Sequence, residues 1–122
     1  MKEYSNFNEW VQQVLNEEDE FSYRYIYDAY RLAENPHRDG LYYTLVTRTN
    51  TEGRLEYVIQ DRQSDYALIL ETEEGRISFT EYLLNRFCPQ TRNMEMWHNQ
   101  RHQWYVDDLN NWVDSDGNPF GS

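Results

Sequence analysis

Cysteine is almost absent from this sequence of 122 residues, because Cys88 is the only one. No disulfide can therefore form within the chain. A lone thiol fits a reducing compartment, so we expect a cytoplasmic protein. Free cysteines are among the most buried residue types, and Pro89 follows this one directly. We interpret Cys88 as a packed thiol and not as a nucleophile.

Long apolar runs are also missing. The longest is YALIL, residues 66–70, far short of the ~20 apolar residues that span a bilayer. The first ten residues, MKEYSNFNEW, contain no apolar core of a signal peptide. Glycine is scarce, with five residues, and neither a phosphate-binding glycine-rich loop nor a nucleophile elbow can be found. We expect no membrane partner, and neither of these two kinds of catalytic site.

Basic residues are outnumbered, because 11 Lys and Arg stand against 22 Asp and Glu, which gives a net charge of −11. Residues 1–40 carry −5, residues 41–92 carry −2 and residues 93–122 carry −4, so both ends are more acidic than the middle. The arginines are scattered, and no basic patch can be read from their positions. Nucleic acid as a direct ligand is therefore disfavoured, since binding it needs clustered bases that displace counterions.

Aromatic side chains, in contrast, are abundant: eleven Tyr, four Trp and five Phe. Each buries about 150–250 Å², so together they can build a core despite a mean hydropathy of −1.02. We expect one domain over residues 1–122, with a mobile acidic tail from about residue 114. Many Tyr hydroxyls should lie at the boundary of the core.

Two helices are predicted in the first third of the chain. Asn6 is an N-cap candidate for the first, with Glu9 three residues later as in a capping box. The apolar stripe of this helix is formed by Phe7, Trp10, Val11, Val14 and Leu15.

The second helix is expected over about residues 21–34 and ends at Asn35-Pro36. Its apolar side is formed by Tyr23, Ile26, Tyr27, Tyr30 and Ala33. The other side carries Arg24, Asp28 and Arg31 at spacings that suit ion pairs. We interpret this side as a self-neutralising face in contact with solvent.

Three strands are predicted next, over residues 40–49, 54–61 and 65–72, which are rich in Tyr, Val, Ile, Leu and Thr. Gly53 in the first turn can adopt a positive φ, which suits a hairpin. A third helix is expected to start at Ser78, because Glu81 completes a capping box with it and Ile77 and Tyr82 form a hydrophobic staple.

The segment after residue 92 fits two patterns. Residues 94, 96 and 98 alternate as in a strand, whereas Met94, Trp97 and Arg101 are spaced as on a helix. We predict a strand and then a short helix capped by Asp107 or Asp108. Trp97 and Trp104 are expected to complete the core.

The expected fold class is α+β: two N-terminal helices, an antiparallel sheet of three to four strands, a third helix, and a short C-terminal strand or helix with an acidic tail. Its α-β-β-β-α portion resembles double-stranded-RNA-binding domains in element order. The basic residues that such a domain needs are absent, so the resemblance does not extend to function.

No metal or cofactor site is expected. His98 and His102 are four residues apart, as helical metal ligands can be, but Asn99 stands where the zincin pattern needs Glu. The run DSDG, residues 114–117, begins like a calcium loop, but the chain ends before a twelve-residue loop is complete. An acid/base site around His98, His102 and Asp107 is the enzymatic alternative.

The acids concentrate in two places. One is residues 16–20, with Glu17, Glu18, Asp19 and Glu20, and the other is the C-terminal segment with Asp107, Asp108, Asp114 and Asp116. Such carboxylates can stand in for DNA phosphates, and Trp112 would add an exposed apolar anchor.

We therefore expect a small non-enzymatic interaction protein that binds and inhibits a basic, nucleic-acid-acting partner. DNA-mimic inhibitors of restriction or CRISPR nucleases, made by phages, are proteins of this class. An immunity protein that neutralises a nuclease toxin is the alternative. The sequence leaves open whether the chain forms a homodimer.

Overall fold

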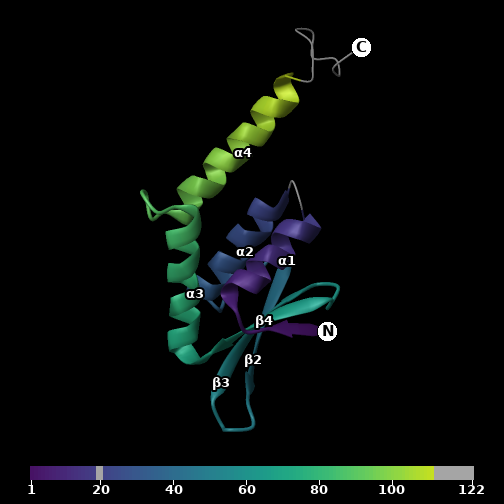
Figure 1. The fold of residues 1–122 in the computed structure, drawn as a ribbon, viewed down its shortest axis with the longest axis vertical. Coiled ribbons are helices and arrows are strands. Elements are labelled where there is room, and N and C mark those ends of the chain that lie inside the picture. The colour runs from purple at the N-terminus through teal and green to yellow at the C-terminus, as the bar shows by residue number, and fades with distance from the viewer. Residues whose placement is uncertain (19–20, 112–122) are drawn as a thin grey trace.

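The computed structural model describes residues 1–18 and 21–111, with side chains described through residue 102. It has the α+β architecture expected from the sequence. A four-stranded sheet carries helices on one face, and the last helix extends away from that layer (Figure 1).

The sheet has the strand order β1-β4-β3-β2. Its strands are β1 (Lys2–Tyr4), β2 (Tyr43–Thr49), β3 (Leu55–Asp61) and β4 (Tyr66–Glu71). The three predicted strands pair antiparallel in sequence order, as their short connections imply. β1 was not predicted: it lies at the sheet edge and pairs in parallel with β4, so the sheet is mixed and not purely antiparallel. Three residues are too few to show an alternating pattern.

The helices are α1 (Phe7–Glu18), α2 (Ser22–Glu34), α3 (Thr72–Phe87) and α4 (Met94–Asn111). The predicted cap of α1 is confirmed, because the backbone N–H of Glu9 donates to Asn6 Oδ1 at 3.0 Å. The predicted hairpin is confirmed as well. Gly53 has a φ of 80°, and the Asn50 side chain accepts the backbone N–H groups of Glu52 and Arg54 at 2.9 Å each.

The core lies between the helices and one face of the sheet. Its largest fully buried side chains include Trp10, Ile26, Tyr43, Phe79 and Leu83. Tyrosine hydroxyls were expected at the boundary of the core, and Tyr4 agrees with this. Its hydroxyl donates to Gln13 Oε1 at 2.8 Å in a partly buried hydrogen bond. Tyr43 and Tyr66 differ, because both are buried and their hydroxyls bond to each other at 2.8 Å. Mutual pairing satisfies two polar groups that burial would otherwise leave without water.

Cys88 is buried at the end of α3, where its backbone N–H bonds to the Leu84 carbonyl. Burial raises the pKa of its thiol. The interpretation of Cys88 as a packed thiol is confirmed by this burial.

α3 begins six residues before the predicted cap at Ser78. Ser78 is exposed in mid-helix, and Glu81 pairs with Arg92 and not with the backbone at Ser78. The first turn carries Glu73 and Glu74, whose carboxylates suit the positive end of the helix dipole. The prediction of the helix start was wrong because the capping-box pattern is only four residues long and occurs here inside a helix.

α4 replaces the predicted strand and short helix with one continuous helix, so that prediction was also wrong. Asn93 caps it, with the backbone N–H of Met96 donating to Asn93 Oδ1 at 3.0 Å. Met94 is fully buried, and the half-buried Trp97 packs against the Phe87 ring at 5.3 Å. The helical spacing of these two contacts with the core outweighs the alternating pattern. The Trp104 side chain, Trp112 and the tail from residue 114 lie outside the described residues.

The face of the sheet opposite the helices has its own small cluster, formed by Val58, Ala67 and Ile69. Arg48 on β2 bonds to Glu56 at 2.7 Å and to Glu3 on β1 at 2.8 Å. One guanidinium therefore connects the two edge strands of the sheet across this face.

Candidate functional site

The carboxylate of Asp28 fixes the segment that enters β2. Asp28 is only 4% exposed, and it accepts the backbone N–H groups of Leu41, Tyr42 and Tyr43 at 2.9–3.0 Å. The predicted ion pairs of Asp28 with Arg24 and Arg31 are not formed, so the self-neutralising solvated face was a wrong interpretation. Helical spacing predicted that the Asp28 carboxylate would pair with the arginines. It bonds instead to three backbone N–H groups that are thirteen to fifteen residues away in sequence.

Gly40 allows this close approach of the segment to α2. A Cβ at this position would lie 2.2 Å from the Tyr43 carbonyl oxygen and 2.9 Å from Asp28 Oδ2. No side chain fits there without a backbone shift, because such distances are well inside van der Waals contact. Glycine therefore holds residues 40–43 against α2.

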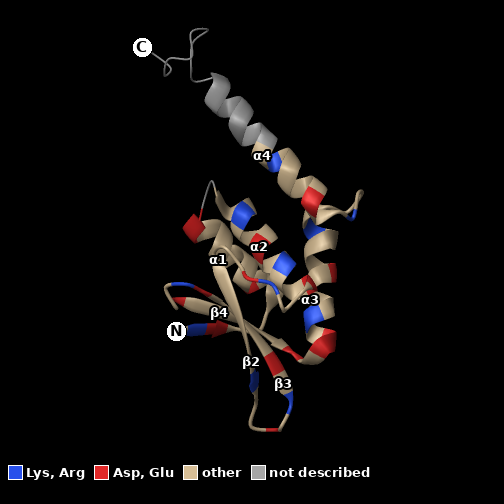
Figure 2. Cartoon of the chain, turned by 180° about the vertical axis from the view of Figure 1, so that it is seen from behind, with Lys and Arg blue, Asp and Glu red and all other residues tan. Residues whose placement is uncertain are grey.

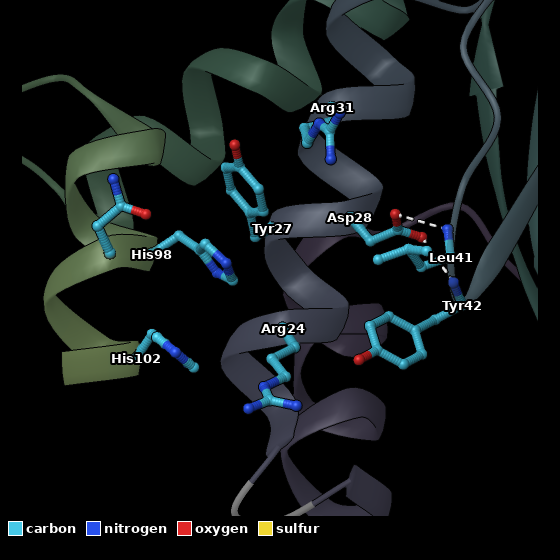
Figure 3. A pocket seen from close by; sticks show the side chains of 9 residues that line it. Arg24, Tyr27, Asp28, Arg31, Leu41, Tyr42, His98 and His102 are labelled. Atoms are coloured by element: carbon cyan, nitrogen blue, oxygen red, sulfur yellow. Dashed lines mark hydrogen bonds between the residues drawn. The ribbon is translucent and has the colours of Figure 1, made fainter. Parts of the chain in front are cut away.

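A cavity of about 300 Å³ opens beside this contact, between α2, α4 and the entry to β2 (Figure 3). We call it the α2–α4 pocket. It is lined by Arg24, Tyr27, Asp28 and Arg31 of α2, Leu41 and Tyr42 of the entry segment, and His98, Asn99 and His102 of α4. Four of its nine lining residues are Arg or His, in a chain with a net charge of −11.

His98 is held in the pocket by an aromatic stack. Its imidazole lies parallel to the Tyr27 ring, with 4.1 Å between centroids and 10° between planes. The Nδ1 atom is buried and has no hydrogen-bond partner among the described residues. Burial lowers the pKa of His98, and the charges of His102, Arg24 and Arg31 lower it further, against a smaller opposite effect of Glu95.

The two arginines differ in their partners. Arg24 donates from Nε to the Tyr23 hydroxyl at 3.1 Å. Arg31 lies over the Tyr27 ring at 5.6 Å, and no described carboxylate forms an ion pair with it. A guanidinium carries five N–H donors, so Arg31 retains the capacity to bind an anion.

Aromatic rings form another wall. Tyr42 stacks on Tyr25, with 4.1 Å between centroids and 19° between planes. Burial and the neighbouring Glu18 raise the pKa of Tyr25 to about 12. Because it stacks on Tyr25, the Tyr42 ring is held as a flat surface beside Arg24 at the edge of the pocket (Figure 3).

The predicted partner-binding residues are only partly described. Glu17 is exposed and Glu18 is half-buried at the end of α1, and burial raises the pKa of Glu18. Asp107 and Asp108 belong to the C-terminal half of α4, where the backbone alone is described. Five further predicted residues lie outside the described part of the chain: Asp19, Glu20, Trp112, Asp114 and Asp116.

Figure 1 shows how α1 and α4 are arranged. The C-terminal half of α4 projects beyond the helical layer along the long axis of the molecule, and the C-terminal end of α1 points toward the same end. The end of α1, which carries Glu17 and Glu18, and the half of α4 that carries Asp107 and Asp108 therefore lie toward one end of the molecule, although ninety residues of sequence separate Glu17 from Asp107.

Over the rest of the molecule, acids and bases are interspersed (Figure 2). Most arginines there bind other parts of the fold. Arg62 donates to the Leu41 carbonyl at 2.8 Å, Arg86 donates to Asn8 Oδ1 at 2.6 Å, and Arg76 bonds to the Ala33 carbonyl. These side chains form hydrogen bonds between different parts of the fold. Their positive charges also offset much of the negative charge of the acids on the sheet and α3.

Within the described residues, no group of three or more His, Cys, Asp and Glu side chains is arranged to hold a metal ion. His98 and His102 share the pocket wall, but the side chain of Asp107, the third residue of the enzymatic alternative, is not described. None of the described helices combines the length and the apolar character needed to cross a bilayer.

Comparison with known proteins gives no relative: no family model, no curated protein and no solved structure matches the chain.

Sequence reasoning missed the α2–α4 pocket. Two signals were present, because Arg24 and Arg31 are seven residues apart on one helix face, and His98 and His102 are four apart on another. Predicting the pocket also required two further facts. Residues 94–102 had to be helical, and Asp28 had to bind backbone N–H groups and not the two arginines. Local spacing fits both a helix and a strand over residues 94–102, and it places Asp28 with the arginines, so it could not reveal the pocket.

Proposed function

We propose that this chain is a non-enzymatic acidic interaction protein that binds and inhibits a basic, nucleic-acid-acting partner. The observation that carries the proposal is the common direction of α1 and α4. Glu17 and Glu18 end the first helix, Asp107 and Asp108 lie on the projecting half of the last, and both parts face one end of the molecule (Figure 1). We call this region the acidic end.

The distribution of charge supports the proposal. Sixteen acids and eleven bases are among the described side chains, which leaves a charge of −5. The remaining −6 comes from six acids at positions 19, 20, 107, 108, 114 and 116, with no base among the residues that follow Arg101. More than half of the net charge therefore belongs to acids that follow Glu18 directly in sequence or that come after Arg101.

A surface of this kind acts on a basic partner in two ways. Its carboxylates can occupy the positions of nucleic-acid phosphates in a positively charged cleft, and the field of the clustered charges speeds association. Screening reduces this attraction beyond about 8–10 Å at physiological ionic strength. Binding should therefore weaken steeply with salt.

The test compares three baits made from the full chain: wild type, Glu17→Gln with Asp107→Asn and Asp108→Asn, and Glu52→Gln with Glu71→Gln and Glu74→Gln. The last variant removes the same charge from exposed positions near the β2–β3 hairpin and the start of α3. Proteins captured from lysate of the native host are quantified, and bound material is eluted with duplex DNA. The captured enzyme is then purified and its nucleic-acid cleavage is measured with each variant.

We expect the wild-type and control baits to capture one basic enzyme. Duplex DNA should displace this enzyme from the baits, and the wild-type and control proteins should both inhibit its cleavage of nucleic acid. Capture on the acidic-end variant should fall by about tenfold or more, since several charge pairs are lost. Equal capture by all three baits, or a captured protein that DNA does not displace, would overturn the proposal. A secreted or contact-dependent nuclease toxin as the partner would identify the chain as an immunity protein instead of a DNA mimic.

A further inference from the structure

We propose that the α2–α4 pocket binds a small organic phosphate. The inference concerns a site separate from the acidic end, and it holds whether or not the chain inhibits a nucleic-acid-acting enzyme. It rests on the charge of the pocket, on donors that lack acceptors, and on the size and aromatic character of the cavity.

The lining of the pocket attracts anions. Arg24 and Arg31 are permanently charged, and His98 and His102 can each donate from a ring nitrogen. The one carboxylate in the lining, Asp28, already accepts three backbone N–H groups, which stabilise its charge. The pocket therefore presents an excess of donors to any molecule that enters it.

Two of these donors lack an acceptor in the described part of the chain. Arg31 forms no ion pair there, and its guanidinium lies over the face of the Tyr27 ring. His98 Nδ1 is buried without a partner, an arrangement that is costly because a buried polar atom loses its bonds to water. A phosphoryl group offers several acceptor oxygens and would bond to the Arg31 guanidinium, with the exposed His102 ring as a second donor.

The spacing of the donors suits an elongated ligand. Arg24 and Arg31 are seven residues apart on α2, which corresponds to about 10 Å along the helix axis. His98 and His102 are one turn apart on α4, and both project toward α2 (Figure 3). Donors therefore line the pocket along its length on two opposite walls.

The size and walls of the pocket favour an organic phosphate over the inorganic ion. A volume of about 300 Å³ lies at the lower end of the range for small-molecule sites, which runs from roughly 300 to 1,000 Å³. Tyr27 and Tyr42 are each fixed by a stacked partner, so their rings are held in place before a ligand arrives. A ligand that joins a planar ring to a phosphate could fill the volume of the pocket and place its ring against these tyrosines.

The probes are AMP, inorganic phosphate, adenosine and succinate, each titrated into the isotope-labelled full chain. Binding is followed through the NMR signals of the His98 and His102 rings and of the Arg31 side chain. We expect saturable shifts with AMP and with inorganic phosphate, AMP binding more tightly. Adenosine and succinate should each bind at least about tenfold more weakly than AMP, since charge-assisted bonds to phosphoryl oxygens are the main attraction.

Two variants test the site, and one serves as a control. Arg31→Gln and His102→Gln should each weaken AMP binding by about tenfold, the loss expected for one charge-assisted hydrogen bond. His102 is exposed, so its replacement leaves the fold intact even if the Arg31 variant unfolds. Arg38→Gln removes the same charge from an exposed loop residue outside the pocket and should leave AMP binding unchanged.

Three results would overturn the inference: no saturable shift of the His98 and His102 signals with AMP, equal weakening by Arg38→Gln, or equal affinity for succinate and AMP. The last would assign the pocket to carboxylates. Because none of these measurements involves a protein partner, their failure would leave the proposed function of the acidic end untouched, and the reverse also holds.

Discussion

The imidazole of His98 lies flat against the ring of Tyr27, with 4.1 Å between centroids and 10° between planes. This stack joins α4 to α2, two helices separated by more than fifty residues of sequence. It also brings a titratable group with a buried Nδ1 next to two arginines. The stack thus connects the docking of α4 to the protonation of His98.

The protonation of His98 should be detectable by NMR. Burial, together with His102, Arg24 and Arg31, lowers the pKa of His98 below its ordinary value of 6.5. Other residues that line the pocket with His98 come from α2 and the entry to β2: Tyr27, Asp28, Leu41 and Tyr42. The unfolded chain therefore takes up this proton more readily than the folded one, and the contribution of His98 to stability falls as the pH drops below 6.5.

A titration of the His98 ring signal, with exposed His37 as the reference signal, should give a midpoint below 6.5. The wild type should also lose thermal stability between neutral and mildly acidic pH to a greater extent than His98→Asn. A midpoint above 6.5 would mean that the imidazole is neither desolvated nor close to the arginines.

Replacing Asp28 by Asn should destabilise the fold by about 2–3 kcal/mol, because a charged acceptor of three backbone N–H bonds becomes a neutral amide. Urea unfolding gives the free energy. Asp39→Asn removes an equal charge from an exposed position and should have little effect. Equal losses in the two variants would indicate that charge, and not the hydrogen bonds, is responsible.

Gly40→Ala should also destabilise, by about 1–3 kcal/mol, as expected when a methyl group is forced into a filled space. The new Cβ would lie 2.2 Å from the Tyr43 carbonyl oxygen, so residues 40–43 must move away from α2. Gly53→Ala is a useful comparison, since nothing lies within 4 Å of a Cβ there and only the positive φ opposes it. The chemical shifts of Leu41 and Tyr42 should move in the first variant and stay in place in the second.

The helix starts can be tested by alanine. Asn93→Ala should lower stability by about 0.5–2 kcal/mol through the lost cap of α4, since the Met96 N–H bonds to its side chain. Ser78→Ala should leave the urea midpoint unchanged or raise it slightly, because alanine has the higher helix propensity in mid-helix. A loss at Ser78 comparable to that at Asn93 would contradict the start of α3 at Thr72.

The features that sequence predicted well depend on neighbours within a few residues. Asn6 caps α1 through a bond to Glu9, and Gly53 and Asn50 close the hairpin among five residues. Hydrophobic periodicity over a dozen residues likewise predicted α1 and α2. In these cases local chemistry and the tertiary fold agree.

The features that it missed depend on distant partners. Asp28 is bonded to backbone groups thirteen to fifteen residues away, and the orientation of α4 depends on the contacts of Met94 and Trp97 with other elements. β1 exists because β4 offers it a free edge. The α2–α4 pocket needs all of α2, α4 and residues 40–43 in place, so no local pattern could predict it.

The parallel pairing of β1 with β4 has a consequence for the order of folding. Lys2 lies opposite Tyr66, so β1 has no partner in the sheet until more than sixty further residues have been made. The β2–β3–β4 portion closes through short turns and needs little loop-closure entropy, whereas docking of β1 closes the longest loop in the sheet. β1 should therefore join the sheet last, and mutations in β1 should speed unfolding while leaving the refolding rate almost unchanged.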